Sequence, residues 1–256
     1  MRYAVLLVVF TGLLSGGSAV ATEQDASAPG RQTISLMDVW TALQKTGPIY
    51  APYAFISHKD TQASQAARKK TLLHEIDNLI WRRQETGNVS VVPGLLQWRQ
   101  RIDAMDGFRT PGQWGPAALL ASARNGVPVT ALATVGACDV PSWVEVWSAQ
   151  GVQRTPWKPG LRLLSLLADN GLSGRGSADV VTIITSYGDR FERGIAAWNE
   201  HDMPVSPGMR IVVPLPIAGQ VGPWLDHTIV RLLAHALPAD HCRQLTIQQH
   251  TTHADD

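Results

Sequence analysis

The 256-residue sequence lacks an excess of charge of either sign, and this excludes one large class of partners. It has 22 basic and 21 acidic side chains, which gives a formal net charge of +1 at pH 7. A protein that binds nucleic acid normally presents a strongly basic face to the phosphates. We therefore do not expect nucleic acid to be a partner of this protein.

The sequence also lacks the short motifs of common enzyme classes. A Gly-x-Ser-x-Gly nucleophile turn is missing, because the stretch from Gly171 to Gly174 does not have the required spacing. Glycine-rich phosphate loops are missing as well. A glycosidase needs two carboxylates about 5–9.5 Å apart in a cleft, and no acidic pair stands in a motif that predicts one. These absences favour a binding protein, with an unrecognised carboxylate pair as the enzymatic alternative.

Patterns of metal ligands are weak, although eight histidines occur. His241, Cys242, His250 and His253 gather near the C-terminus, in residues 241–256, which are expected to be a loose polar tail. Zinc sites usually use closely spaced pairs such as C-x₂₋₄-C or H-x₃₋₅-H on a folded scaffold. Only two residues separate the last two histidines, so we expect neither a metal site nor a cofactor.

The N-terminus has the order of features that is typical of a secretory signal. A positive start at Met1-Arg2 precedes an apolar run over residues 4–14, and an A-x-A cleavage site follows at residues 19–21. The apolar run is too short to span a bilayer, and no second long run follows. We expect residues 1–21 to be a cleaved signal peptide, residues 22–31 a flexible leader, and the mature protein to be periplasmic.

Cysteine is scarce, with Cys138 and Cys242 alone in the chain. In an exported protein both thiols would meet an oxidising compartment, where disulfides form. Spacing along the sequence does not establish that two Cα atoms approach within ~6 Å, as a disulfide requires. A single disulfide and two separate thiols therefore both stay open at this point.

Hydrophobic periodicity predicts a mixed α+β protein. Helices are predicted over residues 57–86, 92–105 and 161–168, and an amphipathic helix over residues 223–237. Short segments rich in β-branched residues or with alternating apolar residues predict strands over residues 31–37, 119–122, 129–136, 143–147, 180–186, 191–198 and 210–213.

The order of the elements between residues 128 and 216 is informative. It runs strand, strand, helix, strand, strand, strand, which is typical of a β-grasp arrangement with one helix crossing a mixed sheet. Such a domain leaves one face or a rim of the sheet free for binding. About 90 residues are enough for a small domain that folds alone.

Several short motifs in this region resemble the SLBB type of β-grasp domain. They are Val135-Gly136-Ala137, Pro141, Lys158-Pro159-Gly160, the stretch from Leu163 to Gly171, and the Pro-Gly turn and strand from Ser206 to Pro214. The wider layout is similar to that of the GfcC family of capsule biosynthesis proteins, on the added resemblance of residues 50–55 and 107–109. Phe108 departs from the family pattern, which commonly has a glycine next to the arginine.

The resemblance implies two β-grasp (SLBB or ubiquitin-like) domains in series. The first would span residues 32–127 and contain a helical insertion, and the second would span residues 128–216. Residues 217–256 would hold the C-terminal amphipathic helix and a polar tail. The implied role is non-catalytic, in the periplasmic stage of capsule or exopolysaccharide assembly and export. A glycan hydrolase and a structural adaptor that binds proteins of the export complex are the alternatives.

Arg109 is the first candidate for contact with a glycan. It matches the arginine of the family pattern and follows a predicted helix end at residues 106–107. A guanidinium group can hold the carboxylate of a uronic acid or a pyruvyl substituent with two parallel hydrogen bonds. The alternative is a loop arginine that caps helix carbonyls or is solvated.

Tryptophan is more abundant than either of the other aromatic residues, with nine against four tyrosines and four phenylalanines. Sugar rings stack on large flat aromatic faces. Trp114 and Trp157 lie in loops rich in glycine and proline, so we expect them to be exposed and to contact ligand. Trp143 and Trp147 share one face of a predicted strand, where core packing is the better interpretation.

The amphipathic helix over residues 223–237 has three interpretations. Packing onto its own domain is the simplest, and docking on a protein of the export machinery is the second. The third is association with the outer membrane, although ~15 residues make a helix of only ~22 Å, too short to span a bilayer easily.

Overall fold

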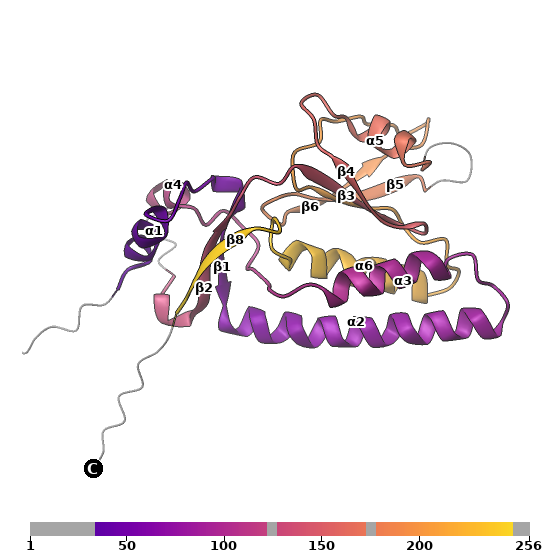
Figure 1. Ribbon diagram of the computed structural model, residues 1–256. Coiled ribbons are helices and arrows are strands. Elements are labelled where there is room, and N and C mark those ends of the chain that lie inside the picture. The colour runs from indigo at the N-terminus through magenta and orange to yellow at the C-terminus, as the bar shows by residue number, and fades with distance from the viewer. Residues whose placement is uncertain (1–33, 122–126, 173–177, 248–256) are drawn as a thin grey trace, which may run out of the picture. The chain divides into compact units, whose positions relative to one another are not determined.

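The chain folds into two β-sheets with helices packed around them (Figure 1). The computed structural model describes residues 34–121, 127–172 and 178–247, which belong to one unit. The predicted signal peptide and leader, residues 1–31, lie outside these ranges. Within them, no helix combines the length and the apolarity that a membrane crossing requires. The mixed content agrees with the predicted α+β class.

The larger sheet has five strands in the order β4-β3-β7-β5-β6. Two antiparallel hairpins flank its centre: β3 with β4, and β5 with β6. The last strand, β7, lies between the hairpins, parallel to β3 and antiparallel to β5. Helix α5 connects the hairpins. The bounds are β3 (Trp143–Ser148), β4 (Gly151–Pro156), α5 (Leu163–Asp169), β5 (Val180–Ile184), β6 (Arg190–Gly194) and β7 (Arg210–Val212).

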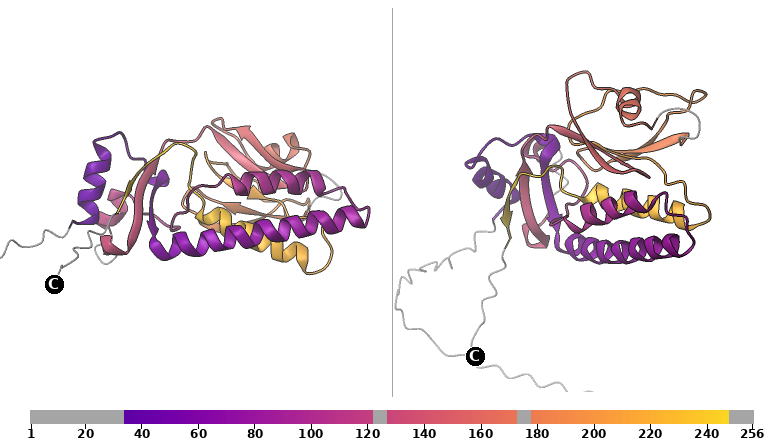
Figure 2. Two further views of the ribbon diagram at one scale, coloured as in Figure 1. Left: turned by 60° about the horizontal axis from the view of Figure 1, so that its bottom comes forward. Right: turned by 45° about the vertical axis from the view of Figure 1, so that its right-hand side comes forward.

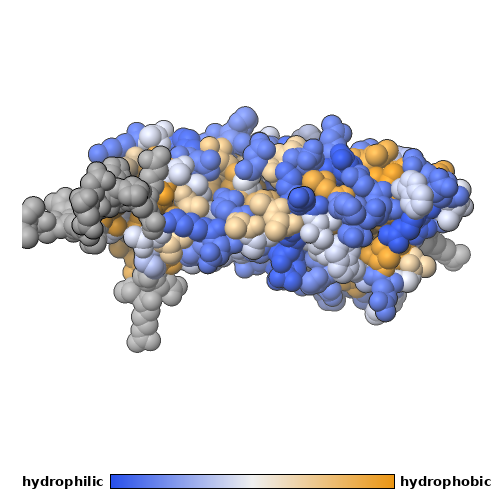
Figure 3. Space-filling view, turned by 90° about the horizontal axis from the view of Figure 1, so that it is seen from below, coloured by the Kyte–Doolittle hydropathy of each residue, from blue (hydrophilic) through white to orange (hydrophobic). Residues whose placement is uncertain are grey.

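Helices cover both faces of this sheet (Figures 1 and 2). Because side chains alternate along a strand, Val144 and Val146 of β3 join the core beneath α5, whereas Trp147 joins the core of the opposite helical layer. That layer contains α2 (Lys59–Glu85), α3 (Val92–Asp103) and α6 (Val221–His235). The outer side beneath α2 is mostly hydrophilic, with small scattered apolar patches (Figure 3).

The smaller sheet has the order β1-β2-β8, with both pairs antiparallel. Its core combines strand residues such as Ile56 and Val135 with Trp40 and Leu43 of helix α1. The bounds of the remaining elements are α1 (Leu36–Gln44), η1 (Ala51–Tyr53), β1 (Ala54–His58), α4 (Pro116–Ala121), η2 (Val129–Ala131), β2 (Leu132–Cys138) and β8 (Cys242–Thr246).

The four predicted helices are confirmed as α2, α3, α5 and α6, with ends that differ by at most two residues. The amphipathic helix α6 packs on its own chain: Leu225, Ile229, Leu232 and Leu233 are all buried in the core that α2 and α3 share. Packing onto its own domain, the first of the three interpretations, therefore describes the apolar face of α6.

Two strand predictions in the N-terminal half of the chain are wrong. Residues 31–37 were expected to be a strand, but helix α1 begins at Leu36. Ser35 and Asp38 form a capping box, in which the Ser35 hydroxyl accepts from the Asp38 N–H at 3.2 Å and the Asp38 carboxylate accepts from the Ser35 N–H at 2.9 Å. Residues 119–122 were also expected to be a strand, but residues 116–121 form helix α4.

Two further corrections concern strand pairing. The predicted strand at residues 129–136 forms as β2, yet it pairs with β1 and β8, and the partner of β3 is β4, which was not predicted. The expected boundary at residue 127 therefore does not separate the two sheets, since the chain passes between them after Cys138. The expected loose tail contains strand β8, and residues 248–256 lie outside the described residues.

Candidate functional site

A buried carboxylate in the larger sheet organises the candidate site. Glu145 lies in the middle of β3, and its side chain is 0% exposed. Three guanidinium groups donate to it through their Nε atoms: Arg101 at 2.9 Å, Arg154 at 2.8 Å and Arg210 at 3.1 Å. The Trp147 indole adds a fourth hydrogen bond at 3.3 Å. With its acceptor positions used in this way, Glu145 is a structural anchor and not a free base.

Strand register brings these charges together. Glu145 lies opposite Arg154 in the antiparallel pair of β3 and β4, and opposite Arg210 in the parallel pair of β3 and β7. Side chains at paired positions share one face of a sheet, so the three form a row across the strands. Arg101 reaches the row from the last turn of α3. Burial lowers the pKa of Arg210, although the Glu145 carboxylate opposes that effect.

A second carboxylate, Asp240, holds the outer ends of two of these arginines. It accepts from both terminal nitrogens of Arg154, at 2.6 and 2.9 Å, and one nitrogen of Arg101 lies 3.5 Å away. The Trp143 indole donates to the same carboxylate at 3.0 Å. The Arg154 guanidinium also stacks on the Trp143 ring, 4.0 Å from its centroid. Asp240 lies in the segment between α6 and β8.

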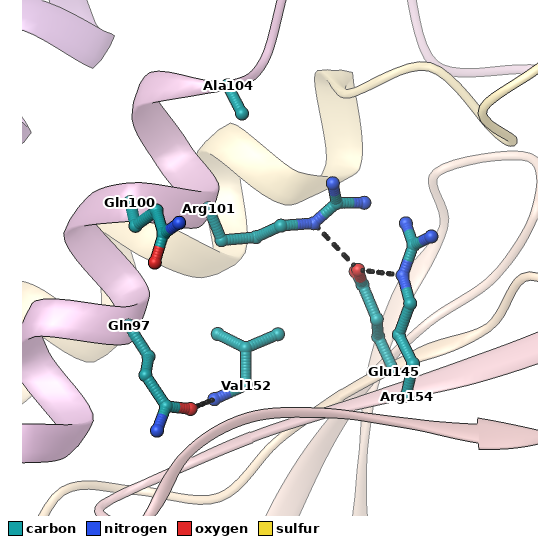
Figure 4. Close-up of a pocket in the computed structure, with 7 residues that line it drawn as sticks. All are labelled: Gln97, Gln100, Arg101, Ala104, Glu145, Val152 and Arg154. Atoms are coloured by element: carbon teal, nitrogen blue, oxygen red, sulfur yellow. Dashed lines mark hydrogen bonds and ion pairs between the residues drawn. The ribbon is translucent and has the colours of Figure 1, made fainter.

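We define Arg101, Arg154 and Arg210 as the arginine cluster. An open cavity of about 530 Å³ lies beside its members Arg101 and Arg154 (Figure 4). The cavity is bounded by α3 on one side and by β3 and β4 on the other. Its lining is Gln97, Gln100, Arg101, Ala104, Glu145, Val152 and Arg154. A smaller cavity of about 150 Å³ shares Arg101 and Ala104 with it and extends to Arg210 and Asp240.

The chemistry of the lining suits a ligand with many hydroxyl groups or a negative charge. Three arginines and two carboxylates leave the cluster one positive charge in excess. Guanidinium groups donate only, whereas the amides of Gln97 and Gln100 both donate and accept, as a sugar hydroxyl does. Gln97 accepts from the Val152 N–H at 3.2 Å, which leaves its NH₂ group able to face the cavity.

Arg109, the first predicted ligand contact, lies elsewhere and is 1% exposed. One terminal nitrogen donates to the Ser186 carbonyl, but its Nε and Nη2 atoms are buried without a hydrogen-bond partner. Desolvation, reinforced by Arg210, lowers the pKa of Arg109 to about 9. In this conformation the side chain is not available to a ligand in solution, because the loop that carries it is covered by the end of α6.

The two predicted tryptophan contacts also lie apart from the cluster, and the expectation that they are exposed is wrong. Trp114 is half-buried against the core of the smaller sheet and donates to the Thr110 carbonyl at 3.0 Å. Trp157 is half-buried against the core beneath α5 and donates to the Val205 carbonyl at 2.7 Å. Each indole thus has a structural partner for its N–H group.

Cys138 and Cys242 are joined by a disulfide with an S–S distance of 2.09 Å. The two residues are paired in register at the ends of β2 and β8, which explains how cysteines 104 residues apart meet. The bond fixes the C-terminal strand two residues beyond Asp240. Cys242 is therefore not a free metal ligand, and no group of three metal-binding side chains gathers within residues 34–247 as far as they are described. His250 and His253 lie outside those residues.

A second open cavity of about 530 Å³ lies between α6 and the strands β5, β6 and β7. It contains two carboxylates, Glu192 and Asp226, together with Arg190 and His227. Burial raises the pKa of Asp226 to about 6, although the carboxyl accepts from the Leu215 N–H at 3.2 Å. A carboxyl with its pKa raised toward the neutral range is the kind of group that can serve as a general acid.

Comparison with known proteins adds no family to these observations. Neither the search against protein-family models nor the search of curated proteins found a match to this chain. The site is therefore interpreted from its own geometry.

Sequence reasoning did not identify the arginine cluster, although one signal was present. The segment Trp143-Val-Glu145-Val-Trp147 has a carboxylate at the centre of an otherwise apolar strand. A charge at a buried position requires partners of opposite sign. Arg101, Arg154 and Arg210 are spread over more than 100 residues, so their convergence depends on strand register that the sequence alone did not supply.

Proposed function

We propose that this protein is a periplasmic, non-catalytic glycan-binding protein that serves the assembly or export of a capsule or exopolysaccharide. The observation that carries the binding role is the cavity beside the arginine cluster, where guanidinium, carboxylate and amide groups converge. The periplasmic location and the pathway rest on the signal-like N-terminus and on the resemblance to GfcC-like proteins.

The topology of the larger sheet supports the proposed family relationship. Two hairpins flank the central strand β7, which is parallel to β3, and one helix crosses between the hairpins, as expected for a β-grasp domain of the SLBB type. The helices between the paired strands β1 and β2 support a helical insertion in a first domain. A first β-grasp domain that ends at residue 127 has less support, because β2 and β8 complete its sheet from outside that range.

Hydroxyl recognition is the function that the lining supports best. Small-molecule sites rely on a few well-placed polar groups in a concave surface. Gln97, Gln100 and Arg101 all come from α3 and line one side of the cavity, so one helix positions three polar side chains (Figure 4). Only Ala104 and Val152 offer apolar contact there, which is a poor fit for a hydrophobic peptide anchor.

Calorimetric titration of the mature protein with tetrasaccharides tests this proposal. Arg154→Gln removes one donor and one charge from the cavity, and Arg82→Gln removes the same charge from an exposed position of α2. We expect saturable binding that Arg154→Gln weakens and Arg82→Gln preserves, with no release of reducing ends. Absence of binding to neutral and acidic tetrasaccharides at millimolar concentration would reject glycan recognition and favour a protein-binding adaptor.

A glycan hydrolase is the second candidate, and the cavity with Glu192 and Asp226 is where it would act. The raised pKa of Asp226 is the specific observation in its favour. Release of reducing ends from a polysaccharide by the wild-type protein, lost in both Asp226→Asn and Glu192→Gln, would establish this activity. Equal and negligible release by all three proteins would leave the non-catalytic proposal in place.

A further inference from the structure

We infer that the ligand of the arginine cluster carries a carboxylate, as a uronic acid or pyruvylated sugar does, and that Asp240 occupies the place of this carboxylate in the free protein. The inference deepens the proposed glycan-binding function and rests on it. It assigns Asp240 the role of a built-in competitor for the ligand.

The first support is the geometry of the Arg154–Asp240 pair. Both terminal nitrogens of Arg154 meet the two oxygens of one carboxylate, at 2.6 and 2.9 Å. Such a parallel, two-bond contact is how a guanidinium fork recognises a planar carboxylate. The same carboxylate also receives the Trp143 indole N–H. The fork is therefore fully shaped for a carboxylate, and Asp240 already fills it.

The second support is the orientation of the arginines. Arg101 and Arg154 both use Nε to bind Glu145, so their terminal nitrogens point the other way, as Figure 4 shows. Glu145 thus binds the Nε atoms of both guanidinium groups and leaves their terminal nitrogens for a second carboxylate. The arrangement presents a pre-organised carboxylate site, because the arginines stay in position when the outer partner leaves.

The third support is the contrast in exposure between the two carboxylates. The Glu145 side chain is 0% exposed, whereas Asp240 is 38% exposed and Arg154 is 33% exposed. Both partners of the outer pair can regain water when they separate, so another carboxylate can replace Asp240 at a smaller cost than it could replace the buried Glu145. Glu145 cannot be exchanged in this way, because its removal would leave three buried or half-buried guanidinium groups without a compensating negative charge.

The fourth support is the room beside the pair. The cavity of about 530 Å³ adjoins Arg101 and Arg154 and is lined by the two glutamine amides. A carboxylate at the position of Asp240 would place its sugar ring next to these amides, where hydroxyl groups find donors and acceptors. An acidic peptide would use the same fork but would leave the amides without hydroxyl partners, so we favour the acidic glycan.

The location of Asp240 explains how it acts as a competitor. It lies between the end of α6 and β8, and the Cys138–Cys242 disulfide holds β8 two residues further along the chain. A tethered carboxylate competes with a ligand at a constant effective concentration, and the apparent affinity falls by the fraction of protein whose site is free. Removal of the competing charge should therefore strengthen binding of an acidic ligand.

The test is a calorimetric titration of wild type, Asp240→Asn and Asp240→Ala with tetragalacturonate, maltotetraose and tetraglutamate. Asp103→Asn is the matched control, since it removes one exposed negative charge two residues from Arg101 without vacating the fork. We expect both Asp240 variants to bind tetragalacturonate about three- to sixfold more tightly than wild type. Asp103→Asn should change the affinity less than twofold. The double variant Asp240→Asn with Arg154→Gln should lose the gain in affinity that Asp240→Asn alone shows.

Three results would overturn the inference. Equal affinity of wild type and both Asp240 variants for tetragalacturonate would show that Asp240 does not compete. Tighter binding of maltotetraose than of tetragalacturonate by every protein would also overturn the inference, but it would leave the proposed glycan binding intact. A larger gain for tetraglutamate than for tetragalacturonate would assign the fork to an acidic peptide. Failure of every protein to bind either tetrasaccharide would instead reject the proposed function itself.

Discussion

The arginine cluster has a buried floor at Glu145 and a more exposed rim at Asp240, and Arg101 and Arg154 contact both carboxylates. The floor is the Glu145–Arg210 pair, with side chains that are 0% and 5% exposed. The rim is the Asp240–Arg154 pair, with side chains that are 38% and 33% exposed. Each pair contains one carboxylate and one guanidinium group, but the burial of the two pairs differs. Glu145 in the floor holds the arginines in position, whereas at the rim a ligand carboxylate can replace Asp240.

The physical reason for this division is desolvation. A buried carboxylate loses its hydration and depends wholly on its guanidinium partners, so removing it leaves uncompensated charges inside the protein. A more exposed carboxylate regains water when its partner leaves, so breaking its ion pair costs less. The position in the fold, and not the residue type, decides which carboxylate is structural. The following changes test that distinction, beginning with the largest expected effect.

Glu145→Gln should lower the free energy of unfolding by about 3–5 kcal/mol, because it leaves Arg210 buried beside a neutral amide. The matched change at the rim, Asp240→Asn, should lower it by less than about 1 kcal/mol. Urea unfolding followed by tryptophan fluorescence measures both. Similar losses for the two variants would contradict the division into floor and rim.

Cys138→Ser with Cys242→Ser should lower the free energy of unfolding by about 2–4 kcal/mol, since the bond closes a loop of 104 residues in the unfolded chain. This change loosens the rim but leaves the floor in place. Amide hydrogen exchange should therefore increase in β8 and around Asp240, while β3 keeps its protection. Faster exchange in β3 and β8 alike would show that floor and rim are one cooperative unit.

Arg109→Met should raise the free energy of unfolding by about 1–3 kcal/mol, because two buried guanidinium nitrogens there have no hydrogen-bond partner. Arg210→Met should lower it, because Arg210 donates to Glu145 and to the Leu237 carbonyl at 2.8 Å. Both arginines are buried, so changes of opposite sign in the thermal stability of the two variants would show that hydrogen-bond partners, and not burial alone, decide the effect. A loss of stability in Arg109→Met would contradict this account of Arg109.

Asp226 is a half-buried carboxyl without an arginine partner among the described residues, and its effect on stability should appear as a pH dependence. Burial raises its pKa to about 6, so between about pH 4 and pH 6 the folded state binds a proton that the unfolded state has lost. The contribution of this group to stability is therefore fully present below about pH 4 and is lost as the pH rises through 6. Urea unfolding between about pH 4 and pH 6 should show a free energy of unfolding that decreases as the pH rises, and Asp226→Asn should remove this decrease. The same decrease in the variant would assign the pH dependence to another group.

Helices were predictable from the sequence where local patterns decide the structure. The stripe of Leu72, Ile76 and Leu79 in α2 has the three- and four-residue spacing of a buried helix face. Strand pairing was not predictable in the same way. The segment that became β2 carries the expected β-branched residues, but its partner β8 lies about 100 residues away in a stretch that is rich in polar residues.

The candidate site illustrates the same limit. The prediction of Arg109 rests on its match to the family pattern and on its place after a helix end, yet the chain covers it with α6, an arrangement that no local pattern encodes. Glu145 is a charge in an otherwise apolar strand, a signal that the site predictions did not use, and its three arginines come from α3, β4 and β7. The local sequence therefore contains a signal for the anchor of the site, but only tertiary register supplies its partners.

The most direct test of the central claim is the indole N–H resonance of Trp143 during a titration with tetragalacturonate. This N–H donates to Asp240 at 3.0 Å, so it reports directly on what occupies the rim. Comparison with Trp143→Phe assigns the resonance. We expect it to move saturably with tetragalacturonate and to start from a shifted position in Asp240→Asn. A resonance that stays unchanged while calorimetry detects binding would place the ligand elsewhere and contradict the assignment of the arginine cluster as the binding site.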